Sequence, residues 1–129
     1  MTTEEINALL AKPLHAIVAT TRRTAPPQLT PVWFYWDGEC FYFSTTRDRA
    51  KYPNLKRDPA IALIVDDPAT HKYVAAYGQA ELIEDNVLEL TRPILARYMA
   101  GERLAQFEAS VMNSNRIIVA LRPEQIVTN

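Results

Sequence analysis

The sequence predicts a single domain of the α+β class, mainly β, built as a small antiparallel barrel with helical additions over residues 1–129. Its length is that of one domain. Several β-rich runs follow one another with hairpin signals, and helical runs lie between and after these groups. A parallel doubly wound sheet would need a helix after nearly every strand, so the antiparallel arrangement fits the sequence better.

The first third of the chain predicts one helix and three strands. Residues 2–11 predict a helix, because Thr2 and Glu5 match a capping box and the following apolar residues share one face. The dipeptide Asp37–Gly38 predicts a hairpin turn. Pro31 indicates an edge strand or a bulge, since proline cannot donate to a β-ladder. The three strands are expected at 15–21, 28–36 and 39–45.

The rest of the chain predicts helices and strands in mixed order. The expected elements are a short helix after Asp48, strands at 60–66 and 72–84, helices at 85–101 and 102–112, and a last clear strand at 116–121. Pro93 is expected to kink or split the helix 85–101, and Gly101 to end it. One face of the strand 72–84 carries mostly small side chains, so we expect another group to approach it closely.

Composition and charge disfavour several classes of partner. The formal net charge is −1, so no overall field draws the chain to nucleic acid or to a membrane. No apolar run approaches the roughly 18 residues of a membrane-spanning helix, and the acidic first residues do not resemble a signal peptide. The single cysteine, Cys40, cannot form an internal disulfide, which indicates a reducing compartment. We therefore expect a cytoplasmic protein.

Glycine is scarce and scattered, which excludes two common nucleotide-binding motifs. The three glycines lie far apart, at Gly38, Gly78 and Gly101. A P-loop or a dinucleotide fingerprint needs several glycines within one turn, because the backbone must approach the phosphates closely. A phosphate bound by this chain must therefore be held largely by side chains.

Positive charge is concentrated in the stretch "STTRDRAKYPNLKRDP", residues 44–59. It holds five cationic and two anionic side chains directly after a predicted strand. If Asp48 caps a short helix, then Thr45, Thr46 and the first helical N–H groups converge with Arg49 and Lys51 on one place. Pro53 leaves two forms of this helix open: it is kinked, or it starts later with Pro53 in its first turn. Hydroxyl groups, N–H groups and cations together are the donors that a phosphate requires.

Two other readings of this stretch remain open on residue chemistry alone. Any short surface helix carries such charges, so a solvated face with local ion pairs, such as Asp48 with Arg49 or Lys51, has about even odds. A nucleic-acid patch is a minor alternative, because the net charge is near zero and no nucleic-acid motif is present.

The stretches "PQLTPVWF", "FSTTRDRAK", "NLKRDP", "YGQAEL", "LARYMAG" and "RIIVALRPEQIV" occur in this order. Together they resemble the pyridoxamine 5'-phosphate oxidase-like split β-barrel proteins that bind flavin mononucleotide (FMN) or coenzyme F420, a deazaflavin. The resemblance is closest to the branch of F420-dependent reductases and covers about residues 5–127. It implies an antiparallel split β-barrel of the FMN-binding type, and a homodimer with cofactor sites at the subunit interface.

The resemblance also implies a set of cofactor-binding residues. Arg49 and Lys51 would bind the phosphate, and Tyr73 and Tyr77 would approach from the partner subunit. The ring system and the ribityl chain would contact hydroxyl groups of one strand and side chains of its neighbour, namely Ser44, Thr45, Thr46, Gln28, Thr30 and Val32.

Other residues offer little independent chemistry. His15 and His71 stand alone, and a lone histidine is more often structural than catalytic, by roughly four to one. No cluster of residues has metal-ligand spacing, so no metal site is predicted. Cys40 is expected to pack in or beside the core. Asp66 and Asp67 precede a proline and indicate a turn rather than an acid–base pair.

The resulting hypothesis is an FMN- or F420-dependent oxidoreductase that transfers a hydride to or from a small organic substrate. The cofactor supplies that chemistry and the protein supplies binding, orientation and electrostatics, so no catalytic residue is required. Sequence does not separate FMN from F420, although the resemblance leans slightly to F420. The alternatives are a non-catalytic carrier or sensor that binds flavin, F420 or heme, and an interaction module for an acidic partner.

Overall fold

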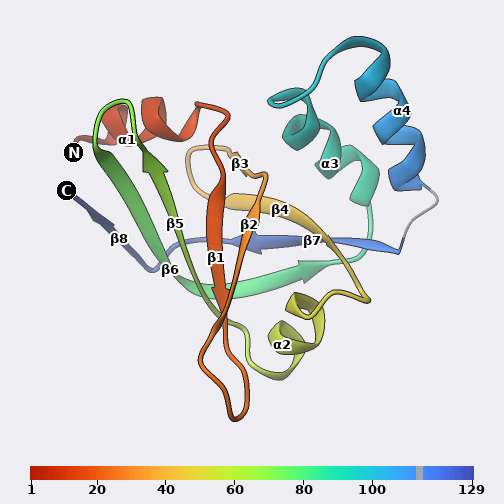
Figure 1. Ribbon diagram of the computed structural model, residues 1–129, viewed down its shortest axis with the longest axis horizontal. Coiled ribbons are helices and arrows are strands. Elements are labelled where there is room, and N and C mark those ends of the chain that lie inside the picture. The colour runs from red at the N-terminus through yellow and green to blue at the C-terminus, as the bar shows by residue number, and fades with distance from the viewer. Residues whose placement is uncertain (113–114) are drawn as a thin grey trace.

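The computed structural model describes residues 1–112 and 115–129, and these form a curled antiparallel sheet with helices around it (Figure 1). The helices are α1 (Thr3–Leu10), α2 (Lys51–Arg57), α3 (Val87–Ala96) and α4 (Gly101–Met112). The strands are β1 (Ala16–Thr20), β2 (Gln28–Val32), β3 (Tyr35–Trp36), β4 (Phe41–Thr46), β5 (Ala60–Asp67), β6 (Lys72–Ile83), β7 (Arg116–Leu121) and β8 (Gln125–Thr128). This confirms the predicted α+β class and antiparallel pairing.

The sheet curls because β6 belongs to both of its halves. The strand order is β2-β1-β5-β6-β7-β4-β3, and β8 also pairs with β6. Residues 72–79 of β6 pair with β5, whereas residues 80–83 pair with β7. β8, which the sequence pattern did not predict, pairs with residues 74–77. The long strand β6 therefore connects the two halves of the sheet, which face different directions.

Gly78 lies where β6 passes between the two halves. A Cβ atom at this position would lie 2.9 Å from Leu121 Cδ1 and 3.2 Å from the backbone oxygen of Arg122. The Glu124 N–H also donates to the Tyr77 carbonyl, at 2.9 Å. The close approach predicted for the small face of this strand is therefore made by the connection between β7 and β8.

The main hydrophobic core fills the inside of the curled sheet. Alternate residues of β1, β5 and β6 point inward, as the burial of Val18, Leu63 and Val65 shows. Phe34, Phe41 and Phe43 close the core from the side of β3 and β4. No residue of α3 or α4 belongs to this cluster, among the residues that the structure describes.

The strand predicted at 28–36 is two strands, β2 and β3, separated at Trp33 and Phe34. The Phe34 N–H donates to the Tyr98 hydroxyl at 3.3 Å, and the Arg97 guanidinium donates to the Phe34 carbonyl. Arg97 also donates to the carbonyls of Leu10 and Lys12. Arg97 and Tyr98, which follow α3, thus form hydrogen bonds with the backbone N–H and carbonyl of Phe34. These groups are then not available for pairing with another strand, so the prediction of one continuous strand was wrong.

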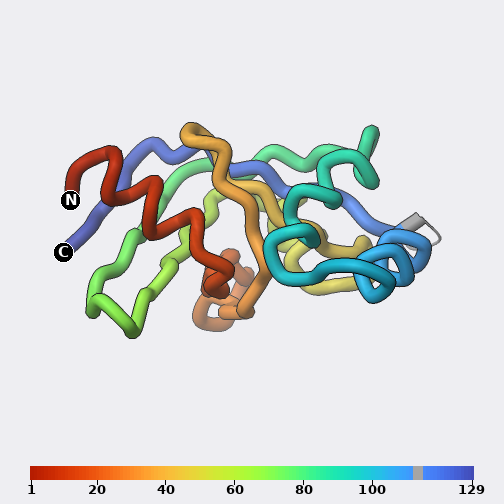
Figure 2. The backbone as a smooth tube through the Cα atoms, turned by 90° about the horizontal axis from the view of Figure 1, so that it is seen from above, coloured from red at the N-terminus to blue at the C-terminus, as the bar shows by residue number. Residues whose placement is uncertain are grey.

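The α1 helix has the predicted capping box and closes one end of the sheet. The Glu5 N–H donates to Thr2 Oγ1 at 3.1 Å, and the Thr2 N–H donates to Glu5 Oε1 at 3.0 Å. Beyond the helix, Lys12 Nζ lies 2.5 Å from Asp67 Oδ2 at the end of β5. Figure 2 shows both chain termini at this end of the molecule.

The α2 helix begins at Lys51 rather than near Asp48, which is the later of the two starts that Pro53 left open. Its N-cap is Ala50, which provides no side-chain cap. The Asp48 carboxylate instead accepts a hydrogen bond from the Thr46 hydroxyl. Pro53 therefore lies in the first helical turn, where the missing N–H would have no partner within the helix.

The α3 and α4 helices lie together over the outer side of β4 and β7, at the end of the molecule away from the termini (Figures 1 and 2). α3 ends at Ala96 rather than at Gly101, and Pro93 lies inside it without dividing it. Gly101, with φ of +63°, begins α4 instead of ending the preceding helix. None of the described helices is long and apolar enough to cross a membrane.

Candidate functional site

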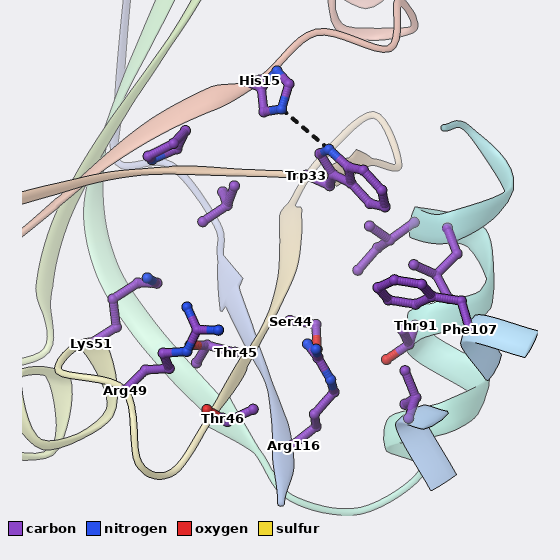
Figure 3. A pocket seen from close by; sticks show the side chains of 15 residues that line it. His15, Trp33, Ser44, Thr45, Thr46, Arg49, Lys51, Thr91, Phe107 and Arg116 are labelled. Atoms are coloured by element: carbon purple, nitrogen blue, oxygen red, sulfur yellow. Dashed lines mark hydrogen bonds between the residues drawn. The ribbon is translucent and has the colours of Figure 1, made fainter. Parts of the chain in front are cut away.

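A cavity of about 320 Å³ lies where the end of β4 meets α2, α3 and α4 (Figure 3). Its lining comes from segments that are far apart in the sequence, including the start of β1, the end of β2, β4, β7 and three helices. Six of the ten predicted cofactor-binding residues line it: Val32, Ser44, Thr45, Thr46, Arg49 and Lys51. The structure therefore brings together the residues that follow β4 with one residue of β2.

The last residues of β4 present hydroxyl groups on both sides of the strand. Thr45 is buried on the side of the barrel core, whereas Ser44 and Thr46 point to the side covered by α3 and α4. Because the cavity reaches the end of the strand, side chains from both faces line it. A short strand end of this kind offers several hydroxyl donors and acceptors within one site.

Lys51 is buried in the first turn of α2, with 7% of its surface exposed. Burial lowers the pKa of its ammonium group below the ordinary value, and the positive charge of Arg49 lowers it further. No carboxylate forms an ion pair with Lys51 or Arg49 among residues 1–112 and 115–129. A buried cation without an anion is costly, so this site is suited to a negatively charged ligand.

The other cations of the stretch 44–59 have partners elsewhere. Arg47 donates to Glu84 Oε1 through Nη2 at 3.0 Å and forms an ion pair with it. Arg57 donates to the Thr21 carbonyl at 2.6 Å. Lys56 is exposed and lies over the ring of Tyr52, 5.4 Å from its centroid. The reading as a solvated charged face thus describes part of the stretch, while Arg49 and Lys51 face the cavity.

Arg116, at the start of β7, is a cavity residue that the sequence analysis missed. It pairs with Thr46 across the β4–β7 ladder, and its Nη1 donates to Ser44 Oγ at 3.2 Å. Its Nε is buried and has no hydrogen-bond partner in the described part of the chain. Burial lowers the pKa of this guanidinium, and the nearby charge of Arg49 adds to the effect. Its place in the cavity follows from the pairing of β4 with β7, in which Thr46 lies opposite a residue 70 positions later in the sequence. A local sequence pattern does not contain this information.

The end of the cavity under α3 and α4 is largely apolar and aromatic. Trp33 lines it, and Tyr98 stacks on this indole at 4.7 Å between centroids and 6° between planes. The Trp33 Nε1–H donates to His15 Nε2 at 3.2 Å. His15 therefore holds a wall of the cavity, which agrees with the structural role favoured for a lone histidine. Figure 3 shows this pair above Phe107 of α4.

Four predicted residues lie outside this cavity. Gln28 Oε1 accepts a hydrogen bond from Asn54 Nδ2 at 3.4 Å. Thr30 Oγ1, on the same strand, is buried without a partner in the described residues. Tyr73 and Tyr77 lie on the outer face of β6, and Tyr77 is 44% exposed. Their assignment to the cofactor stays a prediction.

The histidines, cysteine and paired aspartates show no further catalytic or metal-binding grouping in the described part of the chain. Within residues 1–112 and 115–129, no cluster of histidine, cysteine, aspartate or glutamate could hold a metal ion. Cys40 is buried, as expected. Asp67 accepts hydrogen bonds from the Ala69 N–H and the Thr70 hydroxyl in the turn after β5, as its position before a proline predicted.

Comparison with known proteins places the chain in a defined group. The sequence profile of the pyridoxamine 5'-phosphate oxidase family matches residues 2–129. A solved F420 reductase is 33% identical, with a TM-score of 0.76 and 94% of each chain covered. The conserved hypothetical protein Rv2991 from Mycobacterium tuberculosis is 24% identical, with a TM-score of 0.85, over 99% of this chain and 84% of that one.

A Listeria innocua protein described as a candidate pyridoxamine 5'-phosphate oxidase shares the fold. It is 20% identical, with a TM-score of 0.75, over 98% of this chain and 96% of that one. These likenesses extend over nearly the whole chain, including α3 and α4. They confirm the split β-barrel fold that the sequence predicted.

Proposed function

The chain belongs to the pyridoxamine 5'-phosphate oxidase family, and on this premise we propose that it is an oxidoreductase that uses a flavin-type cofactor, FMN or coenzyme F420. Its reaction is the transfer of a hydride to or from a small organic substrate. The family includes oxidoreductases and binds flavins, and one similar structure is an F420 reductase.

One observation carries this proposal: Arg49 and Lys51 line the cavity beside the Thr45 and Thr46 hydroxyl groups, without a carboxylate partner in the described residues. Both cofactors carry a phosphate group on a ribityl chain. Charge-assisted hydrogen bonds from a guanidinium and an ammonium are strong ligands for phosphate. The donor set therefore fits the phosphate.

Coenzyme F420 is the first candidate of the two. The F420 reductase is 33% identical over 94% of this chain, above the identity of the other structures described here.

The cofactor supplies the hydride chemistry when it is bound. Lys51 and Arg49 bind its phosphate and thereby fix its position along the cavity. The Ser44 and Thr46 hydroxyls provide hydrogen bonds beside that anchor. The side chains of Trp33, together with those of α3 and α4, exclude water from the other end of the cavity.

We also propose that the protein is a homodimer. Five apolar side chains point outward from neighbouring strands: Ile17, Leu29, Ile64, Tyr77 and Val127, with exposed fractions between 37% and 66%. The strand registers place them on one face of the sheet, opposite the core. A second copy on this face would cover it and would bring Tyr73 and Tyr77 to the partner's cofactor.

The dimer has its own test. Sedimentation velocity should give a dimer for the wild type and a monomer for Ile64→Glu on the central strand β5, because a carboxylate at the centre of an apolar interface is strongly unfavourable. Gln106→Glu on the exposed side of α4 is the matched control and should stay dimeric. A monomeric wild type would rule out the dimer.

Cys40, a buried free thiol, fits a reducing compartment, and we place the protein in the cytoplasm.

The function is tested by titrating the purified protein with F420 and with FMN, read by absorbance and fluorescence. Arg49→Ala and Lys51→Ala should each weaken binding at least tenfold, whereas Lys56→Ala, on the exposed side of α2, should not. Unchanged affinity in both cavity variants would refute the site. Tight binding without substrate-dependent turnover would favour a carrier or sensor.

A further inference from the structure

The cavity has two ends that differ in chemistry. At one end, Arg49 and Lys51 lie beside α2, which packs against β1 and β4. At the other end, Arg116 and Ser44 lie on the outer side of β4 and β7, which α3 covers. Figure 3 shows Arg116 beside Ser44, with Arg49 and Lys51 on the α2 side and Phe107 on the side of the helices.

The charges at the two ends suggest two separate anions. The FMN phosphate is a monoester with a charge of about −1.5 to −2 near pH 7, and the F420 phosphate is a diester with a charge of about −1, so Arg49 and Lys51 together balance either one. Arg116 is then left as a third cation, with no ion-pair partner in the described residues. Its buried Nε has no hydrogen-bond partner there either. Within the described residues its side chain donates to the Ser44 hydroxyl alone, so its guanidinium has donors to offer to a ligand.

The walls at the Arg116 end are flat and apolar. Tyr98 covers one face of the Trp33 indole, and the centroid of the Phe107 ring lies 6.1 Å from that indole with a tilt of 37°. The only polar atom of the indole donates to His15 and is thereby satisfied. What Trp33 presents to the cavity is therefore hydrocarbon surface, which favours contact with a flat apolar group.

We propose that this end of the cavity is the substrate site, and that the substrate is a planar, apolar molecule bearing a carboxylate. Arg116 and Ser44 bind the carboxylate, and Trp33 and Phe107 contact the flat apolar part. His15 is a positioning residue, because its Nε2 holds the indole in place. This inference rests on the proposed function, in which the cofactor phosphate occupies Arg49 and Lys51.

The test uses 2-naphthoate as a probe, titrated by calorimetry into the full chain, both free and loaded with the cofactor that binds. Two related compounds serve as ligand controls in the wild type: 2-naphthamide, which has no charge, and decahydro-2-naphthoate, which is not planar. We expect 2-naphthoate to bind about tenfold more tightly than either one, through a charge-assisted bond and aromatic contact respectively.

Variants then assign the binding to residues. Arg116→Gln and Trp33→Leu should each weaken 2-naphthoate binding about tenfold, while Arg116→Lys should retain part of it. Arg122→Gln, beyond the other end of β7 at an exposed ion pair with Glu39, is the matched control and should leave it unchanged. His15→Gln, which keeps an acceptor for the indole, should retain binding that His15→Leu weakens.

Several results would overturn the proposal. They are the absence of saturable binding, equal affinity for the acid and the amide in the wild type, and competition between 2-naphthoate and the cofactor. A loss of binding in Lys51→Met but not in Arg116→Gln would also overturn it, because the carboxylate would then occupy the α2 end. If neither FMN nor F420 binds, the proposed function fails by itself, and the titration of the cofactor-free protein still decides the carboxylate site.

Discussion

Replacing Lys51 by methionine should stabilise the cofactor-free protein and at the same time weaken its binding of the cofactor. The Lys51 residue is 7% exposed, and its ammonium group has no carboxylate partner in the described residues, so the folded protein holds a buried charge without an ion-pair partner there. Methionine keeps the length and the apolar stem of the side chain without that charge. The same change removes a donor to the phosphate.

The two effects have opposite signs and similar size. Removing an unbalanced buried charge should raise the free energy of unfolding by about 1–2 kcal/mol. For a chain of this length, each kcal/mol of added stability raises the melting temperature by roughly 3–6 °C. Loss of a charge-assisted hydrogen bond of about 1.5–3 kcal/mol should weaken cofactor binding by roughly 10- to 150-fold.

The effect on stability should also depend on pH in a defined direction. Burial and Arg49 lower the pKa of Lys51, so the charged form is disfavoured in the folded state. The cost is therefore fully present below the lowered pKa and is lost as the pH rises toward the ordinary lysine value of about 10.4. The gain from Lys51→Met should be largest near neutral pH and should shrink in alkaline buffer.

Thermal unfolding with and without cofactor, together with a binding titration, measures both effects. Lys56→Met is the matched control, because Lys56 lies exposed on the same helix and should change stability by less than about 0.5 kcal/mol. A Lys51→Met protein that is less stable without cofactor yet binds it normally would show that Lys51 supports the fold, and the reasoning from unbalanced charge would be refuted.

Three further predictions concern the scaffold. Arg97→Met should lower the free energy of unfolding by about 2–4 kcal/mol in urea titrations, because three backbone carbonyls lose their donor, whereas Arg92→Met, at an exposed ion pair, should cost less than about 1 kcal/mol. Gly78→Ala should lower the free energy of unfolding by about 1–3 kcal/mol, since the new Cβ would lie 2.9 Å from a side chain of β7. An unchanged free energy of unfolding in the same titration would show that this site has room for a Cβ atom. The hydrogen bond from Lys12 holds the pKa of Asp67 below its usual range, so the stability it provides is present above about pH 4 and is lost as the pH falls through the lowered pKa. Melting curves of Asp67→Asn should accordingly lose the acid-dependent part of the decline, and a wild-type-like pH profile would count against this linkage.

Local patterns in the sequence were enough to predict the fold class, the order of most elements and the residues around the cation-rich stretch. The capping box at Thr2 and Glu5 is seen as predicted, because both partners lie within one turn. The capping role considered for Asp48 was wrong, because Asp48 bonds to Thr46 instead, and α2 has the later start with Pro53 in its first turn. A residue with two nearby partners cannot be assigned to one of them from sequence spacing alone.

The errors that matter most involve contacts between distant segments. Arg116 joins the cavity only because β7 pairs with β4, and the break at Phe34 depends on Arg97 and Tyr98, more than 60 residues away. β8 is short and mostly exposed, so apolar and polar residues do not alternate clearly along its sequence. Only its pairing with β6 defines it as a strand. Such features follow from topology, which a local pattern does not contain.

The absence of α3 and α4 from the main core cluster has a consequence for how this protein could diversify. Phe107 and Val111 line the cavity without being part of the packing that holds the barrel together. Substitutions there can change which molecules fit while leaving the proposed phosphate-binding residues and the barrel untouched. Selection for a new substrate could therefore act on one helical segment, with little risk of losing the folded state.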